Sequence, residues 1–147
     1  MNRSIHKQAG IGLAAAALAL LLLVNGCSGL SRSPHSGPPS EDIACLTEQH
    51  QYPEGTRSIT IQVVEQGDFR GELDKPYLEV ERSGQWYVLP KQSSENEPAN
   101  LLFVSGRTEW EIGLAAYDLG PGQYRAVFDY WGGDGYFAFP FEIVEAE

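Results

Sequence analysis

The sequence predicts an all-β fold whose antiparallel strands form a sandwich or a small barrel. From about position 43 onward, apolar and polar residues alternate, which is the pattern of strands that bury one face. Glycine- and proline-rich turn signals separate the alternating runs. No window longer than a turn or two has the period of an amphipathic helix, although residues 113–117 have room for one short helical turn.

The alternating runs indicate the strands in chain order, and their apolar positions are expected to face one core. These positions are Ile59, Ile61 and Val63, then Leu78 and Val80, then Trp110, Ile112 and Leu114, then Tyr124, Ala126 and Phe128, and finally Phe137, Phe139, Phe141 and Ile143. The residues between them are mostly polar, so each strand has a second face for water. A domain of roughly 100 residues buries about two thirds of its unfolded surface, which is enough for independent stability.

Turns and breaks divide these runs. Ser83-Gly84 is expected to be a two-residue hairpin loop, because glycine tolerates the positive φ of such turns. Residues 120–122 introduce one strand, and the glycine-rich residues 132–135 join the last two, whereas residues 92–99 form a polar loop. Pro140 cannot donate a ladder hydrogen bond, so its strand is expected at a sheet edge, or Pro140 marks a bulge.

The first 26 residues have the organisation of a signal peptide. Two basic residues, Arg3 and Lys7, precede an apolar run over residues 11–24. As a helix this run would reach only about 21 Å, less than the roughly 30 Å of a bilayer core, which favours a signal peptide over a membrane span. Residues 23–27, LVNGC, resemble the bacterial lipobox, although Asn25 departs from the small or aliphatic residue usual there.

The lipobox resemblance implies cleavage before Cys27 and acylation of that cysteine. Two acyl chains anchor a protein durably, because each buried methylene contributes about 0.8 kcal/mol. We therefore expect a signal peptide over 1–26, a lipidated Cys27 with a flexible linker over 27–42, and a folded domain over 43–147. The membrane lipid would be a partner, and the location would be extracytoplasmic, on the cell surface or on an outer membrane. His35, in the linker, is expected to be solvated.

Three segments resemble the bacterial immunoglobulin-like domains of surface lipoproteins. They are residues 77–81 (YLEVE), residues 84–90 (GQWYVLP) and residues 119–125 (LGPGQYR). The likeness extends over about 58–144. It implies an immunoglobulin-like antiparallel β-sandwich of about seven strands.

The same resemblance assigns roles to individual residues. It places Trp86 as the core tryptophan of strand C, and it makes Tyr124 a tyrosine corner whose hydroxyl bonds nearby backbone. Ala126 stands where antibody domains have their second cysteine, so no disulfide between the sheets is expected. Cys45, the other cysteine, would be buried as a small apolar residue, with a free or paired thiol as the alternatives.

Charge excludes some partners. Two of the ten basic residues belong to the signal peptide, whereas all twenty acidic residues follow position 40, so the mature part has a net charge near −12. Nucleic acid needs a basic surface, and we expect no nucleic-acid partner.

The sequence contains no recognisable catalytic or metal-binding pattern, and it predicts neither an enzyme nor a cofactor. Nucleophilic catalysis would have to use His50, because His6 lies in the signal peptide and His35 in the linker. The paired carboxylates Glu79/Glu81 and Glu109/Glu111 are expected on solvent faces. The acidic and glycine-rich residues 129–135 lack the spacing of a calcium loop and are expected to form a turn.

Aromatic residues around the last turn are the remaining functional signal. Tyr130, Trp131, Asp134 and Tyr136 flank this turn and could form an exposed patch for a protein, peptide or envelope component. Alternatively, Trp131 and Tyr136 close the end of the core. The expected function is therefore a non-catalytic, lipid-anchored binding module, and the alternative is an accessory envelope lipoprotein without a ligand of its own.

Overall fold

The computed structural model describes residues 29–67, 71–92 and 102–146. The chain separates into two units, Met1–Leu30 and Ser31–Glu147, and the fold below is that of the second unit. The expected signal peptide and the expected lipidation site, Cys27, lie outside the described residues. The described part of the chain contains no helix with the length and hydropathy that crossing a bilayer requires.

The all-β prediction is confirmed, because the described residues form strands and turns and no helix. They contain eleven strands: β1 (Ser31–Arg32), β2 (Ile43–Cys45), β3 (Gln51–Pro53), β4 (Ser58–Glu65), β5 (Glu72–Leu73), β6 (Tyr77–Arg82), β7 (Gln85–Val88), β8 (Leu102–Phe103), β9 (Arg107–Gly113), β10 (Gly122–Asp129) and β11 (Tyr136–Val144). This is four more strands than the expected seven, and β1, β3, β5 and β8 have only two or three residues each.

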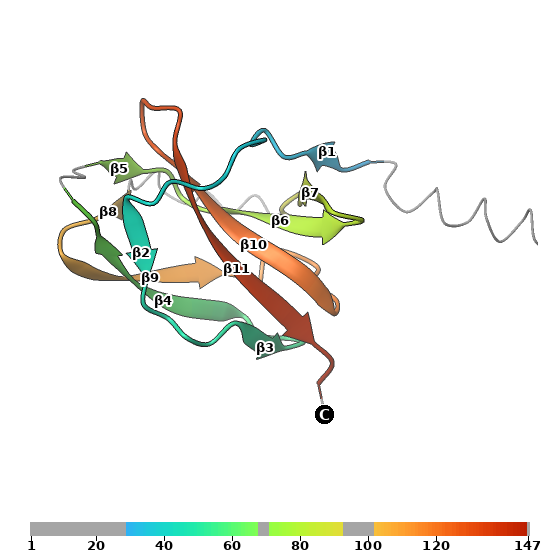
Figure 1. The fold of residues 1–147 in the computed structure, drawn as a ribbon. Helices are drawn as coiled ribbons and strands as arrows, with labels where there is room; N and C mark the ends of the chain where they lie inside the picture. Colours follow the sequence, from blue (N-terminus) through green and yellow to red (C-terminus); the bar gives the residue numbers. More distant parts are fainter. Residues whose placement is uncertain (1–28, 68–70, 93–101, 147) are drawn as a thin grey trace, which may run out of the picture. The chain divides into compact units, whose positions relative to one another are not determined.

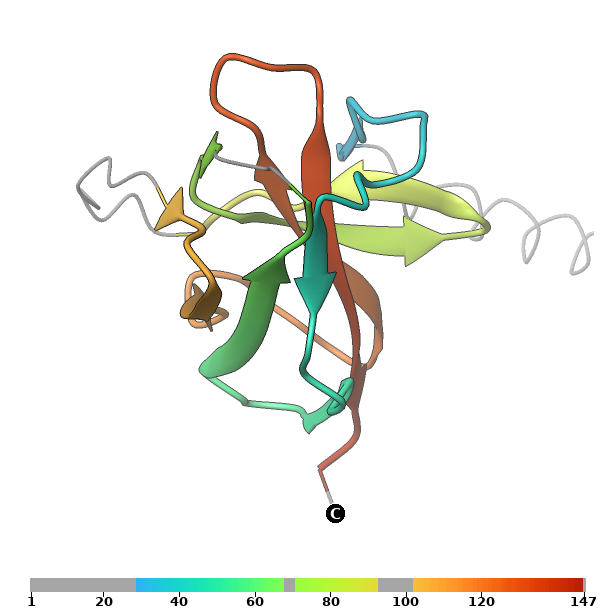
Figure 2. The same ribbon diagram turned by 60° about the vertical axis from the view of Figure 1, so that its left-hand side comes forward.

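The strands form two layers, as Figures 1 and 2 show. One layer is a six-stranded sheet in the order β1-β7-β6-β10-β11-β3, and the other is a three-stranded sheet in the order β2-β4-β9. Neighbouring strands are antiparallel, apart from β3, which runs parallel to β11. A two-stranded sheet of β5 and β8 joins the larger sheet through a bridge between Leu73 and Tyr130.

The core lies between the two layers and consists of the alternating apolar positions. All the apolar positions that the periodicity assigns to the core are buried. Trp110 of β9 packs across the sandwich, with its ring centroid 5.0 Å from Phe128 and 6.0 Å from Phe137. The sheets are therefore held together by side-chain packing, and Cys45, half-buried on β2, is a free thiol.

Two turns follow from local sequence chemistry. The β6–β7 hairpin closes through Ser83 and Gly84, whose φ angles of 52° and 77° are those of a type I′ turn, as the sequence predicted. Residues 114–117 form a tight turn, in which the Tyr117 amide donates to the Leu114 carbonyl over 3.0 Å, in place of the short helical turn considered for that segment.

Pro140 lies in β11, which is not an edge strand throughout. The neighbouring strand β3 pairs with β11 only over residues 142–144. No strand is paired with Pro140 on that side, so its lack of an amide hydrogen breaks no hydrogen bond between strands there. The His50 ring nitrogen Nδ1 lies 2.8 Å from the Pro140 carbonyl oxygen and covers this open position. Pro140 is thus tolerated because pairing starts two residues later.

Trp86 does not occupy the place that the resemblance implied. It lies on β7, half-buried, opposite Glu81 of β6 and on the outer face of the six-stranded sheet. The tryptophan that fills the core is Trp110, which is 4% exposed. The prediction for Trp86 is therefore wrong, because its strand forms the second arm of the hairpin and turns this side chain outward.

Candidate functional site

Residues 31–40, here called the strap, lie across the outer face of the six-stranded sheet. The strap begins as β1, which pairs antiparallel with β7, and the Ser33 amide donates to the Trp86 carbonyl over 2.9 Å. It ends where the Ser40 amide donates to the Tyr136 carbonyl over 2.8 Å. Most of the expected linker is therefore part of the folded unit, because backbone hydrogen bonds hold a segment with little apolar surface to bury.

His35 holds the middle of the strap, so the prediction that it is solvated is wrong. Its Nε2 atom lies 2.7 Å from Oδ1 of Asp129, and its side chain is only 17% exposed. Its ring stacks on Tyr136 with a centroid distance of 3.9 Å and an interplanar angle of 14°. The Tyr136 hydroxyl in turn donates to the Gly37 carbonyl over 2.7 Å. The side chain of His35 therefore contacts both the carboxylate of Asp129 and the aromatic ring of Tyr136.

An ion pair is buried beside the strap. Glu79 of β6 and Arg125 of β10 are cross-strand partners, and Nε and Nη2 of Arg125 lie 2.7 Å and 2.6 Å from Oε2 of Glu79. Glu79 is fully buried, which contradicts the expectation of a solvent-facing carboxylate. Strand alternation does put Glu79 on the outer face, but that face is covered.

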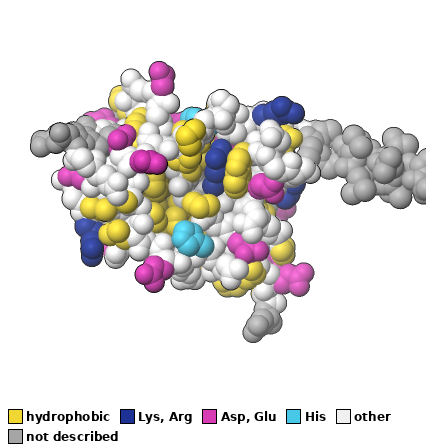
Figure 3. Space-filling model, viewed as in Figure 1, with side chains coloured by type: hydrophobic (Ala, Val, Ile, Leu, Met, Phe, Trp, Pro, Cys, Tyr) yellow, Lys and Arg dark blue, Asp and Glu magenta, His cyan; other side chains and the backbone are white. Residues whose placement is uncertain are grey.

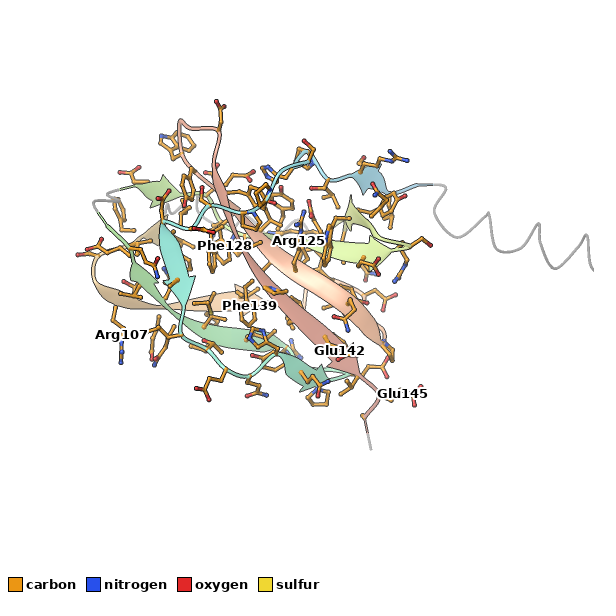
Figure 4. The ribbon with its side chains drawn as sticks, viewed as in Figure 1. Arg107, Arg125, Phe128, Phe139, Glu142 and Glu145 are labelled. Carbon is orange, nitrogen blue, oxygen red and sulfur yellow. The ribbon has the colours of Figure 1, made fainter. Side chains whose placement is uncertain are left out.

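Aromatic rings border the guanidinium of Arg125. Its central carbon lies 4.5 Å from the ring of Trp86 and 5.6 Å from the ring of Tyr136. Figure 4 shows Arg125 on β10 close to the strap, and Figure 3 shows, from the same side, a basic group at the centre of a face that also carries apolar side chains. Such cation–π contacts favour a cation that has been removed from water.

Two buried polar atoms in this cluster have no hydrogen-bond partner: Oε1 of Glu79 and the hydroxyl of Tyr77. Burial raises the pKa of Tyr77, and the nearby charges of Asp129 and Glu79 raise it further. A buried polar atom without a partner costs about 1–3 kcal/mol. The closed strap therefore leaves hydrogen-bonding capacity unused on the sheet beneath it.

The four residues of the predicted aromatic patch are divided by the structure. Tyr136 is 4% exposed and lies under the strap, whereas Trp131 is 62% exposed. Asp134 is exposed in the turn, and Tyr130 is half-buried, with burial raising the pKa of its hydroxyl. The sequence left open whether these aromatic residues form an exposed patch or are covered. Tyr136 is covered, and Trp131 faces solvent.

A second exposed aromatic residue, Phe103, belongs with Trp131. Glu72 of β5 pairs with Phe103 of β8, and the Trp131 amide donates to the carbonyl of Glu72 over 2.9 Å. Phe103 is 61% exposed, so the backbone of Glu72 has an exposed aromatic residue as its partner in each neighbouring segment, about two strand spacings or ~10 Å apart. We call Glu72, Phe103 and Trp131 the aromatic row. Figure 1 shows β5, β8 and the turn after β10 on the left of this unit and β1 on its right.

Other chemistry-bearing residues do not come together. His50 contacts Pro140 and stacks on Phe139, with a centroid distance of 5.1 Å. Glu109 and Glu111 are exposed on β9. Among the described residues, no three His, Cys, Asp or Glu side chains are placed to hold a metal ion together.

These observations define the class of protein as an all-β sandwich with a covered polar face and an exposed aromatic row. No protein-family model matches the chain, and no curated protein matches it.

Sequence reasoning missed Asp129 and Arg125 as contacts of the strap, and Glu72 and Phe103 as neighbours of Trp131. Arg125 carried a usable signal, because it is a charged residue in a strand whose other residues are largely apolar. Phe103 carried none, since its strand has two residues and follows a polar stretch of sequence. The polar loop expected over residues 92–99 lies, after residue 92, outside the described residues.

Proposed function

We propose that this chain is a non-catalytic, lipid-anchored extracytoplasmic binding module with an immunoglobulin-like sandwich. Its partner would be a protein, a peptide or an envelope component. The observation that carries the proposal is the aromatic row, in which Trp131 and Phe103 are each more than half exposed. Exposed aromatic residues supply large contact area at low entropic cost and are enriched at binding hot spots.

The strand order supports the immunoglobulin-like part of the proposal. In that fold, strands A, B and E share one sheet and strands C, F and G share the other. The orders β2-β4-β9 and β6-β10-β11 match these two sets when the strands are taken in chain order. The Tyr124 hydroxyl also donates to the Gly120 carbonyl over 2.7 Å, which is the backbone contact expected of a tyrosine corner.

The anchor rests on the lipobox-like residues 23–27. Three residues separate Cys27 from Ser31, so the two are four Cα steps apart and an extended chain between them spans at most ~14 Å. While the strap is docked, this short connection takes the place of the longer linker expected over 27–42.

The binding role is tested on the aromatic row itself. The full chain, immobilised, is exposed to the solubilised envelope of the producing cell, and the variants Trp131→Ala and Phe103→Ala are compared with Leu46→Ala. Leu46 is a matched control, because it is an exposed apolar residue on another part of the surface. Loss of capture in the first two variants with unchanged melting supports the proposal. Unchanged capture, or collapse of the fold, contradicts it and favours an accessory lipoprotein.

The anchor is tested separately by mass spectrometry of the amino terminus of the native protein. The proposal predicts a mature chain that begins at Cys27 and carries acyl chains on it. A chain that begins elsewhere with an unmodified amino group would contradict lipid anchoring without bearing on the aromatic row.

A further inference from the structure

His35 lies in a site formed by two residues of the sheet, Tyr136 and Asp129, which is here called the pocket. The floor of the pocket is the ring of Tyr136, on which the imidazole stacks at 3.9 Å. Its wall is Asp129, whose Oδ1 lies 2.7 Å from Nε2 of His35. Both residues come from the β10–β11 hairpin, where they are cross-strand partners. The pocket therefore persists when the strap leaves.

The charges around this pocket favour a cation. Glu79 and Arg125 neutralise each other at 2.6 Å, which leaves the carboxylate of Asp129 as the charge that faces the strap residue. The Tyr77 hydroxyl, whose pKa is raised by burial and then by the nearby charges of Asp129 and Glu79, has no hydrogen-bond partner. A guanidinium is planar and always charged, so it stacks on an aromatic ring and pairs with a carboxylate through two parallel hydrogen bonds.

The strap also shows how a peptide backbone is held on this face. It pairs with β7 at Ser31 and Arg32, the Ser33 and Ser40 amides donate hydrogen bonds to the sheet, and the Gly37 carbonyl accepts one from it. These contacts use backbone atoms that any extended peptide presents. The pairing with β7 is the strand-addition mode by which many domains bind peptides.

We propose that the pocket of Tyr136 and Asp129 recognises an arginine side chain of an extended peptide, and that His35 of the strap occupies it in the isolated chain. The strap is then a built-in competitor, which a peptide with the better-fitting cation displaces. This site is separate from the aromatic row, so it goes beyond the proposed function and does not depend on it.

The first test measures peptide binding to full-length variants. The probe is a labelled decapeptide with the strap sequence in which arginine replaces the histidine (SRSPRSGPPS), and the control peptide has alanine at that position. We expect the His35→Ala chain to bind the arginine peptide at least about tenfold more tightly than the wild-type chain does, because its own strap no longer fills the pocket. The variant His50→Ala, a histidine that lies outside the strap, should behave like wild type.

The second test removes the carboxylate. Adding Asp129→Asn to His35→Ala should weaken binding of the arginine peptide by about tenfold or more, because a charge-assisted hydrogen bond is lost. Trp131→Ala should leave this binding unchanged. Loss of envelope capture in Trp131→Ala with normal peptide binding would thus separate the two sites.

A third test needs no added peptide. In the full chain, His35→Arg should keep the strap closed, with hydrogen exchange at the Ser33 and Ser40 amides at least as slow as in wild type, whereas His35→Ala should speed it. The proposal is overturned if the arginine and alanine peptides bind equally, if Asp129→Asn has no effect, or if His35→Arg opens the strap. The exchange result decides the matter even if Asp129→Asn does not fold.

Discussion

Trp110 and Trp86 show how environment decides the role of a residue. Both lie on strands, but Trp110 packs against Phe128 and Phe137, whereas Trp86 stacks over the guanidinium of Arg125 on the outer face. We predict that Trp110→Ala lowers the free energy of unfolding by about 3–5 kcal/mol. Trp86→Ala should cost only about 1 kcal/mol, the value of a partly exposed cation–π contact. Urea unfolding of both variants checks the contrast, and equal losses would contradict the assignment of Trp110 to the core.

The buried ion pair predicts a non-additive result. Arg125→Met leaves the fully buried carboxylate of Glu79 without its counterion, so the free energy of unfolding should fall by about 3–5 kcal/mol. The double variant Glu79→Met with Arg125→Met should recover most of that loss, because replacing both charges with apolar groups is often neutral. Thermal unfolding of the single and double variants measures the coupling. A double variant less stable than Arg125→Met would contradict this description of the pair.

At the scale of elements, the β10–β11 turn depends on the close approach of Gly135 to its neighbours. A Cβ at Gly135 would lie 2.7 Å from the Tyr130 ring and 3.1 Å from the Ser40 hydroxyl. Gly135→Ala should therefore cost about 1–3 kcal/mol and loosen the end of the strap. Gly133→Ala is the matched control, because its Cβ would meet Tyr130 at an ordinary 3.8 Å. Melting temperature, together with hydrogen exchange at the Ser40 amide, would reveal both effects. Equal behaviour of the two variants would show that the turn tolerates a side chain at Gly135.

The long strands could be predicted from sequence, whereas the short ones could not. Period-two alternation identified β4, β9, β10 and β11, because the apolar residues that alternate along their seven to nine residues are buried. Strands of two residues, such as β1 and β5, are too short for any periodicity. Their pairing depends on tertiary contacts, which is why the strap was expected to be linker.

At the scale of the whole molecule, buried tyrosines make stability depend on alkaline pH. Burial raises the pKa of Tyr52, Tyr77, Tyr124 and Tyr130 above the ordinary value of about 10. The unfolded chain loses these protons first and then binds fewer protons than the native chain, so the free energy of unfolding falls as the pH rises past about 10. This contribution is fully present below that pH. Denaturant titrations on either side of about pH 10 should show the loss, and constant stability across that range would contradict the prediction.

The candidate site could be predicted only in part. Trp131 was recognised because successive aromatic residues around a short turn cannot all face the core. Phe103 lies on β8, which is distant from Trp131 in the sequence and does not form a hairpin with its segment. Both residues are backbone partners of Glu72 on β5, and only this pairing places them in neighbouring segments. The covered face was missed for a related reason: alternation shows that Glu79 faces away from the core, but not that a distant segment lies over it.

The aromatic row is tested most directly in the producing cell. A photoreactive amino acid is placed in the full chain at Trp131, at Phe103 or, as the control, at Leu46, and the cells are illuminated. We predict that positions 131 and 103 crosslink to the same partner and that position 46 does not. Equal crosslinking from all three positions, or none from 131 and 103, would contradict a binding surface at this end of the sandwich.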